Sequence, residues 1–377
     1  MSELDVNLFA GAGGLTRGLR LARFNPTILY ENDASAWETL RHNKLVPSDP
    51  PGWKKHKGDV REVRWRDFEG RVRLLAGGVP CQPFSLGGKH LADRDDRNLF
   101  PQLLRAIRYL QPQSVLVENV QGFLREGFEP YFRYILRRLE IPSLKPKSDE
   151  IWKSHDRRLR REQCSAGYQP EYNVVWRLLD AADYGVPQNR RRIFIVATRS
   201  DLPVYRFPAL THSRDALIRS QVSGEYWQRY DLPKPRRNGT RVQAEADSRK
   251  PWLTVRDALR KLPEPADEEE DAAMNHWSIP GARAYTGHDG SRLDWTSKTI
   301  KAGVHGVSGG ENTIIDERGK LRYYTLREMA RLQTFPNQHV FEGARSQVIR
   351  QIGNAVPPRF AAAVARPLYR LLTHETS

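Results

Sequence analysis

The sequence predicts an α/β protein built on an open, doubly wound and mostly parallel sheet, with a smaller domain inserted into the chain. Over the first two hundred residues, short apolar runs alternate with segments whose apolar residues recur at helical spacing. From about residue 199 to about residue 318 this alternation stops, and prolines, glycines and tryptophans are scattered. We therefore expect the main domain in residues 1–198, the inserted domain in 199–318, and a return to the main domain in 319–377.

Short apolar runs are the expected strands of the sheet. They are Val6–Phe9, Thr27–Tyr30, Arg73–Ala76, Ser114–Val117, Tyr172–Leu179 and Ile193–Ala197. A further strand, the third along the chain, is expected to end at Gly58–Val60. Most of these runs stop at glycine or at polar residues, as strands in a parallel sheet commonly do.

Helical spacing of apolar residues predicts the helices. It is found in segments 15–22, 99–110, 326–332 and 360–372. The polar and strongly basic stretch Asp149–Gln163 predicts a surface helix or an insertion between two strands.

Composition narrows the class of protein. The 377 residues carry 61 Lys and Arg against 45 Asp and Glu, a formal net charge of +16, and 39% are hydrophobic. This balance allows a sizeable core and favours a polyanionic partner such as nucleic acid, although a merely basic protein is the alternative. The two cysteines exclude a disulfide scaffold. No apolar run is long enough for a membrane helix and no signal peptide is evident, so we expect a soluble intracellular protein.

A glycine-rich turn, Phe9–Gly14, follows the first expected strand, where backbone N–H groups point towards a bound ligand. The dinucleotide fingerprint G-x-G-x-x-G is not met, because Thr16 stands where its third glycine is required. Glu31 ends the second expected strand, where a carboxylate can bind both hydroxyls of a ribose. Asp59 is expected at the third strand end, where it can accept an adenine amine. Each feature alone also has a purely structural explanation, but together they favour an adenosine-bearing cofactor.

Cys81 is the candidate nucleophile. It follows Gly77-Gly78 and stands between two prolines, which predicts a constrained loop at the carboxyl edge of the sheet, where α/β proteins bind ligands. A thiolate in basic surroundings is nucleophilic, whereas a lone cysteine is otherwise more often inert and buried. Glu118 ends the next strand and should face the same crevice, where it can hydrogen-bond or protonate a ring nitrogen.

Gln188, Arg190 and Arg192 precede and enter the last expected strand. Alternate residues of an extended segment point the same way, so we expect the three side chains to share a face. They can polarise a base carbonyl or hold phosphate and other catalytic groups. An ordinary basic surface strand is the alternative.

In this order, these residues resemble those of the cytosine-C5 DNA methyltransferase family. The resemblance covers most of the chain outside 199–318 and includes Asp96–Phe100, Arg327–Pro336 and Gln351–Pro358. The family loop often reads Gly-Gly-Pro-Pro-Cys, whereas this chain has Val79 before Pro80. A long basic insert near 141–165 also separates two motifs that often lie closer together.

The resemblance implies a Rossmann-like, S-adenosylmethionine-dependent enzyme that methylates cytosine C5 in DNA and releases S-adenosylhomocysteine. The catalytic residues that it implies are Cys81, Glu118, Arg190 and Arg192. The implied cofactor-binding residues are Phe9, Gly11, Gly13, Gly14, Leu15, Glu31, Asn32, Asp59, Val60, Gly78, Pro80, Leu99, Asn354, Ala355 and Val356. The implied substrate-binding residues are Pro80, Gln82, Ser85, Asn119 and Gln188. No metal is implied.

The same resemblance implies double-stranded DNA as substrate, a target cytosine flipped out of the duplex, and residues 199–318 as the target-recognition domain. We expect a bacterial enzyme of the restriction–modification type, cytoplasmic and associated with the nucleoid through DNA. A companion restriction endonuclease is possible as a partner. We expect a monomer and no membrane partner.

Three alternatives are weaker. A tRNA cytosine methyltransferase of the same superfamily would be expected to carry a Cys-Phe-Thr signature near its recognition region, and no cysteine follows Cys164. A catalytically silent DNA-binding module would be favoured by loss of Cys81, Glu118 or the glycine-rich turn, and all three are present. A nicotinamide-dependent dehydrogenase is disfavoured by the failed glycine fingerprint.

Overall fold

The computed structural model describes residues 3–46, 58–80, 98–235, 248–267, 275–284, 289–303 and 312–374. The chain forms two compact units. Unit 1 comprises Met1–Leu179, Arg191–Phe207 and Ala361–Ser377, and unit 2 comprises Asp180–Arg190 and Pro208–Phe360.

Unit 1 contains a six-stranded sheet in the order β2-β1-β3-β4-β6-β5. Its strands are β1 (Leu4–Leu8), β2 (Pro26–Tyr30), β3 (Val72–Gly78), β4 (Ser114–Val120), β5 (Tyr172–Asp180) and β6 (Arg191–Arg199). Strand β1 pairs in parallel with β2 and β3, and β3 with β4, while β4 and β6 are antiparallel. The prediction of a mostly parallel sheet is therefore confirmed.

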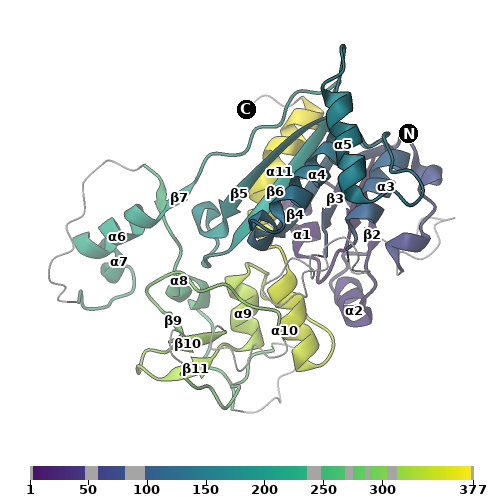
Figure 1. Ribbon diagram of the computed structural model, residues 1–377. Helices are drawn as coiled ribbons and strands as arrows, with labels where there is room; N and C mark the ends of the chain where they lie inside the picture. The colour runs from purple at the N-terminus through teal and green to yellow at the C-terminus, as the bar shows by residue number, and fades with distance from the viewer. Residues whose placement is uncertain are drawn as a thin grey trace. The chain divides into compact units, whose positions relative to one another are not determined.

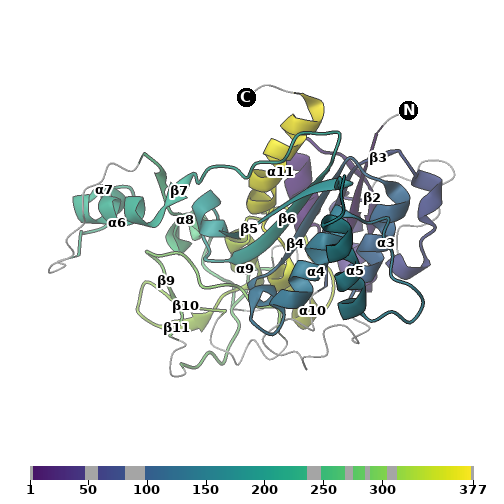
Figure 2. The ribbon, with the colours of Figure 1, turned by 45° about the horizontal axis from the view of Figure 1, so that its top comes forward.

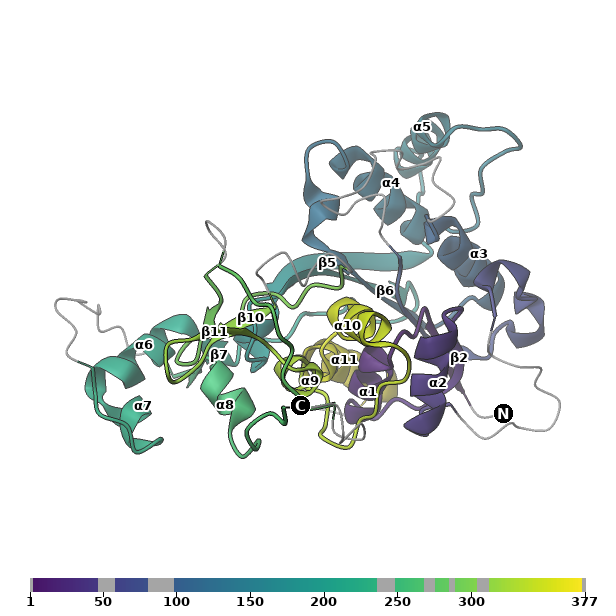
Figure 3. The same cartoon turned by 90° about the horizontal axis from the view of Figure 1, so that it is seen from below.

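Helices cover both faces of this sheet (Figure 3). Helices α3 (Phe100–Leu110), α4 (Glu129–Glu140) and α5 (Trp152–Gln163) lie on one face, and α1 (Gly14–Leu21), α2 (Ala34–His42) and α11 (Pro358–Thr373) on the other. Because both faces are covered, β1, β3 and β4 consist mainly of buried residues, which explains why their sequences read as apolar runs. Short 3₁₀ turns η1 (Val60–Glu62) and η2 (Trp65–Phe68) precede β3, and η4 (Gln121–Leu124) follows β4.

The strand expected to end at Gly58–Val60 was wrongly placed. The third strand of the structure is β3, which begins at Val72, and Asp59 caps the turn η1 instead of closing a strand. The Asp59 carboxylate accepts the backbone N–H of Arg61, a capping contact that favours a helical turn over an extended segment. Residues 47–57 lie outside the described part of the chain.

The C-terminal helix α11 is fastened to the first strands through Arg73. The Arg73 guanidinium lies over the rings of Phe24 and Tyr369, at 5.2 Å and 5.5 Å from their centroids. It also makes a bidentate pair with the buried carboxylate of Asp5, at 3.0 Å and 2.7 Å. Residues from the start and the end of the chain therefore pack around one cation.

Unit 2 contains short strands, short helices and an aromatic cluster. One of its sheets has the order β11 (Leu321–Tyr323), β10 (Thr313–Ile315), β9 (Ser291–Arg292). The other pairs β7 (His212–Ser213) with β8 (Lys250–Pro251). Its helices are α6 (Arg214–Ser223), α7 (Glu225–Gln228), α8 (Val255–Leu259), α9 (Leu326–Leu332) and α10 (Arg345–Asn354), with η5 (Ala181–Tyr184) at its start. Figure 2 shows α6 and α7 beside β7. There Leu217, Tyr226 and Trp227 form a small core that is edged by Trp252 and Trp295.

The basic stretch forms a helix, α5, that packs against α4. His155, which is fully buried, accepts a hydrogen bond from the Tyr134 hydroxyl through Nδ1 when its Nε2 donates to the Leu144 carbonyl, at 3.0 Å and 2.9 Å. Burial, helped by the nearby Arg138 cation, lowers the pKa of His155 to about 4. The α4–α5 contact therefore requires a neutral imidazole.

This buried histidine predicts acid sensitivity. Between pH 6.5 and about 4 the unfolded chain binds a proton at residue 155 that the folded chain does not, so the free energy of unfolding should fall as the pH falls through this window. Urea unfolding at several pH values should show a weaker decline for His155→Gln, whose amide can keep both hydrogen bonds. The exposed His42→Gln is the control and should behave like wild type. Equal pH dependence in all three proteins would contradict the prediction.

Candidate active site

The glycine-rich turn and Glu31 lie together at the carboxyl ends of β1 and β2. Gly11 N–H donates to Oε2 of Glu31 at 2.7 Å, and Asp33 N–H donates to Oε1 at 2.8 Å. Burial raises the pKa of Glu31, and these backbone N–H groups act against that rise by stabilising the carboxylate. Both oxygens retain free lone-pair capacity for further donors. The structure thus fixes a carboxylate beside the turn, where the sequence predicted a ribose contact.

Backbone geometry explains why the turn needs glycine at Gly13. This residue has φ +84° and caps α1, and a Cβ atom there would lie 2.3 Å from Leu45 Cδ1. Phe9 also has a positive φ, 55°, and its ring packs against the main core of unit 1. Gly14 and Leu15 begin α1 and are buried.

Asp59 and Val60 lie next to Glu31 through the backbone, because Gly58 N–H donates to the Glu31 carbonyl at 3.4 Å. Arg61 pairs with the Asp59 carboxylate, and this hydrogen bond lowers the pKa of Asp59. Val60 is buried in the same core against which Phe9 and Leu99 pack. The residues predicted to contact adenine are therefore the carboxylate of Asp59 and apolar side chains that belong to, or pack against, one core.

Glu118 and Arg192 form an ion pair at the carboxyl end of β4. Arg192 Nε lies 3.0 Å from Glu118 Oε1, and both side chains are largely buried. Gly78 of β3 is the register partner of Glu118, and a Cβ atom at Gly78 would lie 3.4 Å from Glu118 Oε2. The short residue at 78 leaves room for the carboxyl group at this edge of the sheet.

Asn119, the next residue of β4, fixes the backbone that leads to the predicted nucleophile. Its buried side-chain amide donates to the Val79 carbonyl at 3.3 Å, and its oxygen accepts the N–H of Val120 at 2.8 Å. Pro80 is the last described residue of this segment. The predicted residues Cys81, Gln82 and Ser85 lie outside the described residues.

In unit 2, Gln188 and Arg190 belong to a buried polar network. Arg190 Nη1 donates to the carbonyl of Ile300 at 3.2 Å, and Nη2 donates to those of Gly353 and Ala355 at 2.7 Å and 2.8 Å. Gln188 accepts the N–H of Ile300 at 3.0 Å. Through these contacts Arg190 holds two backbone segments together. One is at Ile300, and the other is at the end of α10.

Gln333, which the sequence analysis did not single out as a site residue, completes this network. Its amide donates to the Ile352 carbonyl, at 2.6 Å, and its oxygen accepts a hydrogen bond from Gln188 at 3.1 Å. Gly353 is required here because a Cβ atom would lie 2.4 Å from the backbone nitrogen of Ala302. The predicted residues Asn354, Ala355 and Val356 follow directly, with Asn354 exposed and the other two buried.

One protein-family model and several known proteins match this chain over most of its length. The model of the C-5 cytosine-specific DNA methylase family matches residues 5–141 and 151–370. Over 374 residues the chain is 32% identical to the Type II methyltransferase M.Eco47II of Escherichia coli, which covers 97% of this chain and 79% of that protein. It is 30% identical over 371 residues to the Type II methyltransferase M.PspPI of Psychrobacter sp., with 97% and 79% covered.

The chain belongs to the C-5 cytosine-specific DNA methylase family.

Family membership confirms the resemblance and the activity that it implied, sequence-specific methylation of cytosine C5 in DNA, for which S-adenosylmethionine is the methyl donor. A solved structure from E. coli, of a proposed DNA modification methyltransferase encoded within a prophage, superposes with a TM-score of 0.58 at 21% identity, and covers 99% of this chain and 100% of that one. That likeness confirms the predicted fold. Residues 142–150, which the family model leaves unmatched, fall within the basic insert near 141–165 of this methyltransferase.

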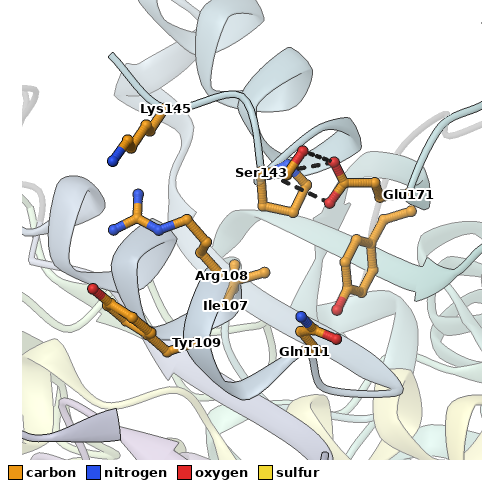
Figure 4. A pocket seen from close by; sticks show the side chains of 9 residues that line it. Ile107, Arg108, Tyr109, Gln111, Ser143, Lys145 and Glu171 are labelled. Atoms are coloured by element: carbon orange, nitrogen blue, oxygen red, sulfur yellow. Dashed lines mark hydrogen bonds between the residues drawn. The ribbon is translucent and has the colours of Figure 1, made fainter. Parts of the chain in front are cut away.

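A cavity of about 380 Å³ lies elsewhere in unit 1 of the methyltransferase (Figure 4). It is lined by Ile107, Arg108, Tyr109, Gln111, Pro142, Ser143, Lys145, Glu171 and Tyr172. Gln111 precedes the start of β4, whereas Glu118 stands near the other end of that strand. Since no described site residue lines this cavity, we assign it no part in methyl transfer.

No cluster of three or more His, Cys, Asp or Glu with the arrangement of a metal site occurs among the described residues. None of the helices in the described ranges has the length and apolar character needed to span a membrane.

The Arg190 network of the methyltransferase yields a stability prediction. Arg190→Met removes a charged donor from three backbone carbonyls, and we expect it to lower the free energy of unfolding by about 3 kcal/mol. Urea unfolding measures this loss, and hydrogen exchange should quicken in peptides covering 300–302 and 353–356. The neighbouring Arg191→Met, at an exposed position, is the matched control and should change stability little. Equal stability of the two variants would show that the network does not hold these segments.

Proposed function

We propose that this chain is a bacterial modification methyltransferase in which Cys81, Glu118 and Arg192 act on a cytosine flipped out of duplex DNA. The observation that carries the proposal is the Glu118–Arg192 pair at the carboxyl edge of the sheet, beside the β3 end that leads to Pro80 and Cys81. Asn119 holds the Val79 carbonyl, which fixes the backbone directly before Pro80. The carboxyl group and the guanidinium thus lie at one edge, and we propose that Cys81, which follows Pro80 in the sequence, acts there.

The residues of this chain meet the chemical demand of the reaction. Carbon 5 of cytosine is a poor nucleophile, so Cys81 thiolate first adds to C6, and the electrons of the C5–C6 double bond move into the ring. Glu118, as the carboxylic acid, donates a proton to N3, and Arg192 hydrogen-bonds O2. Carbon 5 would then bond to the methyl group as the sulfur–methyl bond of the donor breaks and a thioether leaves. Transfer of the C5 proton to water returns an electron pair to the C5–C6 bond and expels Cys81 as thiolate, and N3 returns its proton to Glu118, which leaves 5-methylcytosine.

The described residues suit an adenosyl cofactor. S-adenosylmethionine supplies an electrophilic methyl group on a sulfonium. Glu31, with both oxygens anchored to backbone N–H groups, is positioned to accept two ribose hydroxyls. Asp59 can accept an adenine amine, and Phe9, Val60 and Leu99 offer apolar contacts. Contacts from the other predicted residues, Asn354–Val356 among them, stay predictions.

Charge and composition support duplex DNA as the substrate. A net charge of +16 would hold phosphates on either side of the target base and make binding strongly salt-dependent. We propose that residues 199–318 read base edges in the major groove, as a target-recognition domain. We also propose that the enzyme acts as a monomer in the bacterial cytoplasm, at the nucleoid, with a companion endonuclease for the same site.

Trapping the covalent adduct tests the nucleophile. Duplex DNA carrying 5-fluorocytosine in place of cytosine is methylated at C5, but fluorine cannot leave as a cation, so Cys81 should stay bonded to C6. With S-adenosylmethionine present, we expect wild type to form a complex that survives denaturing electrophoresis. Cys81→Ala should form none. Cys164→Ala, which removes an exposed cysteine, is the matched control and should react like wild type.

The same series tests the other roles. Glu118→Gln should lower the rate of tritiated methyl transfer about 10²–10⁴-fold, because the ring charge is less well stabilised. Bisulfite sequencing of methylated mixed-sequence DNA should reveal one recognition site. Adduct formation by Cys81→Ala would overturn the covalent mechanism, and label found on tRNA but not on DNA would overturn the substrate.

A further inference from the structure

Arg105 contacts the backbone of the turn that carries Asp59 and Val60. It lies in the middle of α3, and its Nη2 donates to the carbonyls of Val60 and Arg61, at 2.7 Å and 3.0 Å. Its Nη1 donates to the carbonyl of Val63 at 3.2 Å. Its Nε donates to the side chain of Gln102 on the same helix at 2.9 Å. Four of the five guanidinium N–H groups are thus committed.

The turn that Arg105 holds is also anchored by its neighbours. It is a single 3₁₀ turn, Val60–Glu62, and its last carbonyls have no partner within the turn itself. The neighbouring anchors are the hydrogen bond from Gly58 to Glu31, at 3.4 Å, and the buried side chain of Val60. The hydrogen bonds of Arg105 join this segment directly to α3.

Helix α3 carries a second predicted cofactor contact. Leu99 is its N-cap residue, and it packs against the same core as Val60. A fixed separation between the turn and the helix therefore fixes how far Val60 and Asp59 stand from Leu99. An adenine bound between such residues needs that separation to match its own dimensions.

We propose that Arg105 is a positioning residue for the adenine of the cofactor. This inference rests on the proposed cofactor site, and it assigns Arg105 no contact with the reacting atoms. Its planar fork is suited to the task because it donates to three carbonyls at once, whereas the ammonium of lysine is a point charge without that fork. Loss of the fork should therefore weaken cofactor binding and leave the chemistry at the target base nearly unchanged.

Calorimetric titration with S-adenosylhomocysteine tests the inference without catalysis. We expect Arg105→Met to raise Kd about 10–100-fold and Arg105→Lys to raise it less. Arg108→Met is the matched control, one turn further along α3, where the side chain lies over Tyr109 and lines the separate cavity. It should bind like wild type. In methyl transfer, Arg105→Met should raise KM for S-adenosylmethionine while kcat at saturation and KM for DNA stay within about 3-fold.

A base-modified ligand separates positioning from general destabilisation. S-inosylhomocysteine replaces the adenine amine by an oxygen, so wild type should prefer the adenosyl compound. Arg105→Met should lose most of that preference, because Asp59 no longer meets the amine, whereas a variant that was only less stable would keep the ratio of the two Kd values. Thermal unfolding of each variant identifies any protein that is not folded, and Arg105→Lys then carries the comparison.

The outcomes separate the two proposals. Failure of wild type to bind S-adenosylhomocysteine would overturn the proposed cofactor site itself. Binding by wild type together with equal affinity and equal base preference in Arg105→Met would overturn the role of Arg105 alone. A drop in kcat without a change in Kd would also overturn it.

Discussion

Two irregular backbone segments of the protein are each held by an arginine that donates hydrogen bonds to backbone carbonyls. Arg190 is buried in unit 2 and donates to Ile300, Gly353 and Ala355, and Arg105 in unit 1 donates to three carbonyls of the η1 segment. Irregular segments have carbonyls that no helix or strand satisfies, and a planar cation with five donors can bind several at once. The chain carries 61 Lys and Arg against 45 Asp and Glu, so some basic side chains have no acidic partner. The structure uses some of them to hold loops.

The parallel sheet of unit 1 accounts for the rest of the site. Parallel strands present their carboxyl ends at one edge, so residues far apart in sequence are brought together without a contiguous motif. Glu31 follows β2, Gly78 ends β3, and Glu118 stands near the end of β4. Strand β6 runs antiparallel to β4, which places Arg192 at its start beside that same edge. The antiparallel strand β6 therefore adds Arg192 to the edge formed by the carboxyl ends of the parallel strands.

The sequence predicts this arrangement well where strands are buried, because buried strands read as apolar runs that stop at glycine or acidic residues. Strands β1 to β4, the glycine-rich turn and the proximity of Glu31 to it follow from that pattern. The strand expected before Asp59 does not, since a carboxylate at a strand end and one that caps a helical turn look alike in sequence. Arg105 and Gln333 were missed because their partners are backbone carbonyls, which every residue possesses. The Arg190 network was missed for the same reason, although Arg190 itself was a predicted site residue.

The packing of Phe24, Arg73 and Tyr369 has a consequence for synthesis of the protein. The ribosome delivers Phe24 and Arg73 early, and Tyr369 only after the whole of unit 2. The face of the sheet that α11 covers must therefore stay open until unit 2 has been made. A nascent chain, or one truncated before residue 358, has the glycine-rich turn and the Glu118 strand but leaves apolar surface without its cover. Chains that do not yet contain α11 are therefore exposed to chaperones and proteases.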